Sequence, residues 1–151
     1  MKKKLLHIKI EGLEDLNRVI VSGQKGVTDA TKEALYAEAS LILNESKKQV
    51  PFRTGVLSGS GMVHDPFVVG KKVGVEISYG GGAVDYALIQ HENLKFRHAP
   101  GRKAKYLEDP VADAKDRLSG RIRQLVALIL RRKGVSLGEV EEFEYGENED
   151  E

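Results

Sequence analysis

The sequence predicts an α+β fold in which a small antiparallel β-sheet packs against two long helices, with a short N-terminal helix and a disordered acidic C-terminal tail. Two long stretches, residues 28–49 and 109–133, carry apolar residues at helical spacing. Between them, residues 73–78 alternate apolar side chains with Gly, Glu and Ser, which is typical of a strand with one buried face. A chain of 151 residues is long enough for one domain with a core. We therefore expect one domain over residues 1–138 and a flexible tail over residues 139–151.

The N-terminal part predicts a strand and then two helices. Residues 5–10 alternate loosely between apolar and polar side chains, so a short first strand is expected. Apolar residues at helical spacing over residues 13–20 predict a short amphipathic helix. The first long helix covers residues 28–49. It ends before Pro51, because the residue preceding a proline is pushed out of the helical region.

The first long helix has an expected cap and an expected buried stripe. Thr28 or Asp29 is the predicted N-cap, since either side chain can accept a hydrogen bond from the first turn. Leu35 and Ile42 are expected to flank the stripe. The residues of the stripe itself are Ala30, Ala34, Ala37, Leu41 and Glu45.

The middle of the chain predicts a β meander followed by a short helix. Residues 62–69 are the expected antiparallel partner of the strand over residues 73–78, with a turn at residues 70–72. Asp65-Pro66 lies inside that partner, and a proline there predicts an edge position, a bulge or an interruption. A run of three glycines then precedes a short helical segment over residues 86–92.

A basic, irregular segment leads into the second long helix. Residues 93–105 are expected to form an exposed loop, and the helix is expected to open near Asp109-Pro110 and to end at Gly134. Its predicted apolar face consists of Val111, Ala114, Leu118, Ile122, Leu125, Val126, Ile129 and Leu130.

Composition excludes several kinds of site and predicts a cytoplasmic product. The chain has no cysteine, which excludes disulfides, thiolate metal sites and a cysteine nucleophile. The basic N-terminus resembles the start of a signal peptide, but Lys9 and Glu11 interrupt its apolar run. No apolar stretch approaches the length that a membrane crossing needs, so we expect no membrane partner.

Charge is distributed unevenly along the chain. Residues 139–151 contain eight of the 23 acidic residues and no basic residue. The remaining 15 acidic and 24 basic residues give residues 1–138 a net charge of +9. A basic body with an acidic tail can face nucleic acid or an acidic partner, whereas a solvated tail that only aids solubility is the simpler reading.

Candidate enzyme sites are incomplete, so we expect neither catalysis nor a cofactor. His91-Glu92 and His98 suggest a metal site, but position 95 is Lys where a zincin helix needs its second His. We therefore expect no metal, and expect His91 to make a polar contact within the fold or across an interface. The glycines do not have phosphate-loop spacing. Ser58, Ser60, His64 and Asp65 are residue types that a hydrolase uses, but no nucleophile-elbow motif accompanies them.

Compared with these enzyme sites, contact with nucleic acid is the alternative with the clearer physical basis. The basic loop and the polar face of the last helix can meet phosphates without reading bases. Asp113 and Asp116 interrupt that helix face, and a solvated face is the competing interpretation. The loop cations are Lys95, Arg97, Arg102, Lys103 and Lys105, and the helix cations are Lys115, Arg117, Arg121 and Arg123.

Two bracketing segments resemble a known family. Residues 50–57, Val-Pro-Phe-Arg-Thr-Gly-Val-Leu, resemble the Val-Pro-x-x-Thr-Gly-x-Leu signature of the head-tail joining proteins of tailed bacteriophages, also called neck, tail-completion or minor capsid proteins. Residues 86–92, Tyr-Ala-Leu-Ile-Gln-His-Glu, resemble the family segment that begins with Tyr-Ala and ends with Glu, and residues 100–110 resemble the loop before its last helix. Order and spacing match over roughly residues 8–130, whereas Arg53 and the acidic tail depart from the pattern.

The resemblance implies a structural role without catalysis. It implies a virion subunit, from an active phage or a prophage, made in the host cytoplasm and placed at the junction of head and tail. It implies a homo-oligomeric ring, a hexamer or a dodecamer, around the DNA channel, next to other neck and tail-terminator proteins. Non-specific contact with DNA in that channel would fall to the five loop cations named above.

The same resemblance implies which residues build the interfaces of the ring. Gly55 is expected at a tight corner between helix and sheet, where Thr54 bonds the local backbone. Tyr86 and Glu92 are expected to hold the returning helix against the sheet or a neighbouring subunit. The full set of expected structural or interface residues is Pro51, Thr54, Gly55, Leu57, Tyr86, His91 and Glu92.

Overall fold

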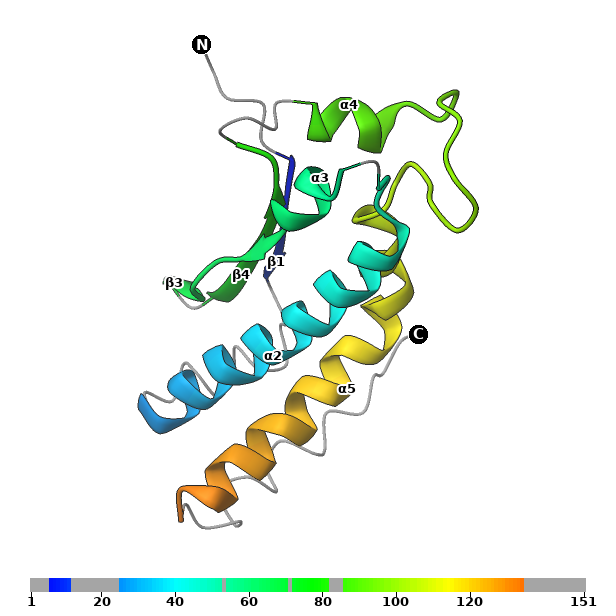
Figure 1. The fold of residues 1–151 in the computed structure, drawn as a ribbon. Helices are drawn as coiled ribbons and strands as arrows, with labels where there is room; N and C mark the ends of the chain where they lie inside the picture. The colour runs from blue at the N-terminus through cyan, green and yellow to red at the C-terminus, as the bar shows by residue number, and fades with distance from the viewer. Residues whose placement is uncertain (1–5, 12–24, 53, 71, 82–85, 135–151) are drawn as a thin grey trace, which may run out of the picture.

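The computed structural model describes residues 6–11, 25–52, 54–70, 72–81 and 86–134, and it confirms the predicted α+β class (Figure 1). The strands are β1 (Leu6–Glu11), β2 (Met62–Val63), β3 (Phe67–Val69) and β4 (Lys72–Tyr79). The helices are α2 (Lys25–Gln49), α3 (Val56–Gly59), α4 (Ala87–Glu92) and α5 (Glu108–Arg132). The helix expected over residues 13–20, Arg53 and the acidic tail lie outside the described residues.

Strand β4 is the centre of the antiparallel sheet. It pairs with β1 along one side, from Leu6 opposite Tyr79 to Glu11 opposite Gly74. It pairs with β2 and β3 along its other side. The apolar members of the predicted alternation, such as Val75 and Ile77, are fully buried, which confirms the strand and its core face.

The predicted interruption at Asp65-Pro66 is a bulge in the edge strand. The N–H of His64 donates to the carbonyl of Glu76 at 2.8 Å, whereas Phe67 lies opposite Gly74. The edge strand therefore advances three residues while β4 advances two, which leaves one extra residue. Proline is tolerated there because it has no N–H to donate to the ladder.

Helix α2 lies between the sheet and α5, and it packs against both (Figure 1). Two contact faces require a wider buried band than the single predicted stripe. Ala30 and Ala34 are buried as predicted, together with these further residues: Val27, Thr31, Leu35, Glu38, Ala39, Ile42, Leu43 and Ser46. Spacings of three and four residues keep that band on one side of the helix, so the predicted stripe was wrong at Ala37, Leu41 and Glu45, which are exposed.

The start of α2 also differs from the prediction. The helix begins at Lys25, one turn before the expected caps Thr28 and Asp29. Val27 is buried in the core, so packing extends the helix beyond the point at which local capping would begin it. The hydroxyl of Thr31 donates back to the Val27 carbonyl at 2.8 Å.

Helix α5 runs antiparallel to α2 and confirms the predicted apolar face. All eight predicted residues are buried or partly buried against the core. Arg121 Nε donates to both carboxylate oxygens of the buried Glu38 at 3.0 Å, and Arg132 reaches Glu33 at 2.7 Å. No described helix combines the length and apolar character that a bilayer crossing needs.

Candidate functional site

The two segments that carry the resemblance meet at one open surface groove of about 600 Å³. The first segment contributes a wall at the end of α2 and the start of α3: Pro51, Phe52, Thr54, Gly55 and Leu57. Tyr86 and Gln90 line it from α4, and the following loop adds Arg97, His98 and Ala99. Five of the seven expected interface residues therefore lie in one place, although 28 residues lie between Leu57 and Tyr86.

A left-handed residue forms the corner of the groove, as the sequence predicts. Gly55 has φ of +81° at the N-cap of α3, and its carbonyl accepts from the Gly59 N–H at 2.8 Å. A Cβ on Gly55 would lie 3.1 Å from the Phe52 ring. The Thr54 hydroxyl is 3.5 Å from the Val56 nitrogen, a long contact, so the glycine determines the corner more than the threonine does.

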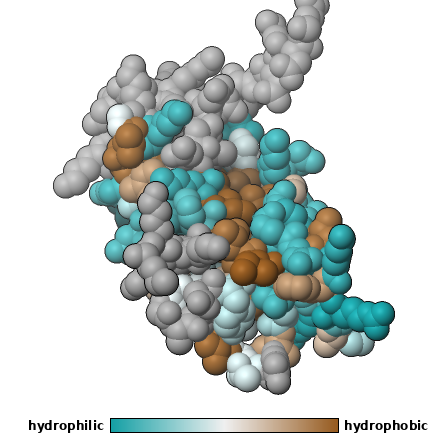
Figure 2. All heavy atoms as spheres, turned by 90° about the horizontal axis from the view of Figure 1, so that it is seen from above, coloured by the Kyte–Doolittle hydropathy of each residue, from teal (hydrophilic) through white to brown (hydrophobic). Residues whose placement is uncertain are grey.

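Exposed apolar side chains surround the groove. Phe52 is 56% exposed, and Val56, Tyr86 and Ile89 are also exposed on the elements that border it. Figure 2 shows hydrophobic residues gathered in the middle of the face that is seen from above, the side on which α4 lies in Figure 1. Apolar surface of this kind on a small protein commonly marks a contact site.

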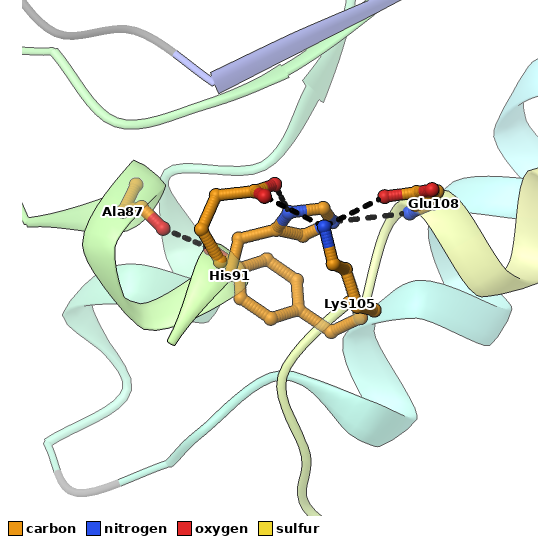
Figure 3. Close-up of polar contacts among 6 residues, drawn as sticks. Ala87, His91, Lys105 and Glu108 are labelled. Atoms are coloured by element: carbon orange, nitrogen blue, oxygen red, sulfur yellow. Dashed lines mark hydrogen bonds and ion pairs between the residues drawn. The ribbon is translucent and has the colours of Figure 1, made fainter. Parts of the chain in front are cut away.

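His91 and Glu92, the other two expected interface residues, form a clasp next to Gln90, which lines the groove. Figure 3 shows the polar contacts of His91 in this clasp. His91 is only 1% exposed. Its Nε2 accepts from the backbone N–H of Glu108 at 3.1 Å, so that nitrogen carries no proton. The proton is therefore on Nδ1, which donates to Glu92 at 2.6 Å. The expected polar role of His91 is a contact within the fold, between α4 and α5.

Lys105 completes the clasp with two carboxylates. Its ammonium lies 2.6 Å from Glu92 and 3.1 Å from Glu108, and its backbone N–H donates to the His91 carbonyl at 2.8 Å (Figure 3). Hydrogen bonds from Lys105 and His91 lower the pKa of Glu92, and bonds to Glu92 and Glu108 raise the pKa of Lys105.

Two buried tyrosines connect the clasp to the core. The Tyr106 hydroxyl donates to the Ala87 carbonyl at 2.7 Å, and its ring meets His91 and Tyr79 edge-on at 5.0 and 5.2 Å between centroids. The Tyr79 hydroxyl pairs with Ser46 of α2 at 2.8 Å, and burial raises its pKa to about 12. The sequence prediction did not include Tyr106, although an aromatic directly after a basic loop was a usable signal. Within the loop expected to be exposed, residues 93–105, Ala104 is buried, and Tyr106 and Leu107, between that loop and α5, are fully buried.

The clasp contains residue types that can bind a metal ion, but their ligand atoms already have hydrogen-bond or ion-pair partners. Ligand atoms of His91, Glu92 and Glu108 lie within 4.8 Å of one another. The only unprotonated nitrogen of His91 already accepts a backbone hydrogen bond, and the ammonium of Lys105 bonds both carboxylates. A cation is therefore present as a side chain, and a metal would have to displace it.

Three of the five loop cations bond to the protein itself. Arg102 donates to the carbonyls of Lys47 and Val50 and lies over the Phe52 ring, 5.5 Å from its centroid. Lys103 pairs with Asp109, and Lys105 belongs to the clasp. The remaining two, Lys95 and Arg97, are exposed.

The hydrolase residue types do not form a catalytic set in the described part of the chain. His64 Nε2 pairs with Ser78 on β4 at 2.7 Å, not with Ser58 or Ser60. Ser60 donates to the Leu57 carbonyl and accepts from the N–H of Gly80, which ties α3 to the end of the sheet.

Comparisons of the chain with protein-family models, with curated proteins and with solved structures gave no match.

Replacement of Gly55 by Ala should lower the free energy of unfolding by about 1–2 kcal/mol, because a side chain disfavours the left-handed conformation. Urea unfolding measures the change. Gly59→Ala is the matched control, since Gly59 is helical and a Cβ there would have no atom within 4 Å. That control should be neutral or stabilising, and equal stabilities for the two variants would contradict the proposed role of the corner.

The clasp should make the free energy of unfolding depend on pH in the acidic range. The folded pKa of Glu92 lies below its ordinary value of 4.5, so its contribution is fully present above that value and is lost as pH falls through the folded pKa. Glu92→Gln should therefore destabilise the protein at pH 7 and reduce its loss of stability below pH 4.5, measured by urea unfolding across pH. The control is Glu45→Gln, because Glu45 forms an exposed pair with Lys48. If the pH dependence of stability changed as much in Glu45→Gln as in Glu92→Gln, the clasp would not be its source.

Proposed function

We propose that this chain is a structural virion protein of a tailed bacteriophage or prophage, a ring subunit that joins head to tail around the DNA channel. The observation that carries the proposal is the convergence of the two resembling segments on one open groove. The two segments are distant in the sequence, and their meeting at one exposed surface supports the proposal, because an assembly surface requires it.

The chemistry of the groove supports contact with protein rather than turnover. Its walls combine apolar and polar surface, with the exposed ring of Phe52 at the edge, and a packed aromatic is a frequent anchor of a protein interface. A ring needs such a patch on every copy, together with a complementary patch elsewhere on the same chain. A hexamer or a dodecamer satisfies that requirement, and further partners would be neighbouring neck and tail-terminator proteins at the head-tail junction of the virion.

A non-catalytic nucleic-acid-binding module is the alternative function. The intramolecular bonds of Arg102, Lys103 and Lys105 weaken it, because phosphates would have to compete with carbonyls and carboxylates that these cations already bind. Lys95 and Arg97 remain exposed for weak contact with DNA inside a channel.

The ring predicts a defined assembly in solution. Light scattering and negative-stain imaging of the purified chain, alone and with neck or tail partners, should give a closed ring. Phe52→Asp should abolish the assembly while the chain stays folded. Leu128→Asp is the matched control, since Leu128 is 57% exposed on α5 and does not line the groove. A strict monomer at high concentration under all these conditions would contradict the proposal.

The alternative predicts a steep dependence of DNA affinity on salt. As a ring subunit, the isolated chain should bind free duplex DNA weakly, and the double variant Lys95→Glu, Arg97→Glu should change assembly with phage partners more than it changes DNA binding. Fluorescence anisotropy from 50 to 200 mM salt measures this. Tight binding that falls by about 10³ or more over that range and is lost in the variant would favour the nucleic-acid module.

A further inference from the structure

We propose that the groove receives the acidic C-terminal segment of a second copy of this chain, residues 139–145, in a head-to-tail contact. This inference rests on the self-association in the proposed function and names the contact that produces it. Three observations carry it: the charge of the groove, the composition of the tail and the length of chain between them.

The groove carries positive charge and no acid among its described lining residues. Arg97 is exposed, and within the described part of the chain it has no hydrogen bond or ion pair. The guanidinium of Arg102 lies over the Phe52 ring. His98 also lines the groove, and its Nε2 is buried without a hydrogen-bond partner among the described residues. An apolar floor with a cationic edge suits a ligand that combines aromatic and acidic groups.

The tail has that combination. Residues 139–145 read Glu-Val-Glu-Glu-Phe-Glu-Tyr, so three apolar or aromatic side chains alternate with four carboxylates. Phe143 and Tyr145 supply large apolar surface, and the flanking carboxylates supply charge opposite to that of Arg97.

A second groove on the molecule distinguishes this ligand further. It lies between α2 and α5 and has a volume of about 700 Å³. Its lining carries the carboxylates of Glu38, Glu45 and Asp113 and also three cations, Lys48, Arg117 and Arg121. Acids and bases balance in the second groove, whereas the first groove has a cation and no acid among its described lining residues. Charge therefore favours the first groove for an acidic segment.

Chain length favours a second copy as the donor. The first groove lies near the start of α5, because Gln90 of α4 lines it and the neighbouring His91 bonds Glu108. The described chain leaves α5 at its other end, at Gly134 (Figure 1). A helix of 25 residues is about 37 Å long. From Gly134, a fully extended chain carries Val140 at most about 22 Å, Phe143 about 32 Å and Tyr145 about 40 Å. Only the end of the segment could span the length of α5, so the segment as a whole does not reach its own groove.

A tail donated to the next copy makes a heterologous contact. Each copy then offers one groove and one tail, and repetition of such a contact closes into a ring when the rotation permits. The groove, which both resembling segments line, would thus set the direction in which copies assemble.

Complementary variants of the full-length chain test the contact. Arg97→Glu disables the groove, and the double variant Phe143→Ser, Tyr145→Ser disables the tail. In sedimentation velocity, each variant alone should associate at least about tenfold more weakly than the unchanged chain. A 1:1 mixture should form pairs but no larger ring, because only one groove and one tail remain compatible. Lys95→Glu is the matched control, an equal charge change on the same loop outside the groove, and it should assemble normally.

A labelled peptide separates this inference from the proposed function. A fluorescent peptide of residues 138–147 should bind the tail variant, whose groove is free, and should bind the Arg97→Glu chain at least about tenfold more weakly. Unchanged assembly of the tail variant, or a mixture that stays monomeric, would overturn the inference and leave the ring proposal standing. Peptide binding that depends on Arg97, in a chain that associates into pairs or open chains but never closes, would overturn the ring and support the contact.

Discussion

The buried imidazole of His91 is the interaction on which the arrangement around the groove depends. The first N–H groups of a helix have no intrahelical acceptor, and Leu107, at the N-cap of α5, supplies no side-chain acceptor. His91 supplies one from α4 by accepting the Glu108 N–H. A single side chain therefore caps α5 and fixes α4 against it. Removal of the imidazole would leave the Glu108 N–H without an acceptor and would create a buried cavity at the same point.

The aromatic contacts extend that constraint through the molecule. Tyr106 lies between His91 and Tyr79, and Tyr79 bonds Ser46 of α2, so one buried chain of contacts joins α4, the sheet and the first long helix. Gly61 passes beside Tyr79, where a Cβ would lie 2.7 Å from the ring. Because each member is confined by the next, the short helix α4 holds a defined position despite its six residues.

The sequence predicted the parts of the fold that depend on local periodicity. Strand β4 and α5 each pack an apolar face against α2, so the period of their apolar residues follows one simple pattern. Helix α2 packs against two layers, the sheet and α5, so a single predicted stripe does not describe its buried surface. Leu41 was assigned to that stripe but is exposed. Half of the site was also predictable, since Pro51 and Gly55 each impose a local backbone constraint. The contact between His91 and Glu108 was not, because it depends on how the chain folds back over a separation of 17 residues.

The charges of this molecule show why a basic composition is weak support for binding to nucleic acid. The positive excess over residues 1–138 is real, yet many of its members act inside the fold: Arg102 on backbone carbonyls, Lys105 in the clasp, and Arg121 on the buried Glu38. Cations that bond internal acceptors position a surface, whereas an exposed one can recognise a partner. At the groove the first kind holds Phe52 and α4 in place, and Arg97 is left to face outward. Recognition at the groove therefore combines its shape and the exposed Phe52 ring with polar groups and the charge of Arg97.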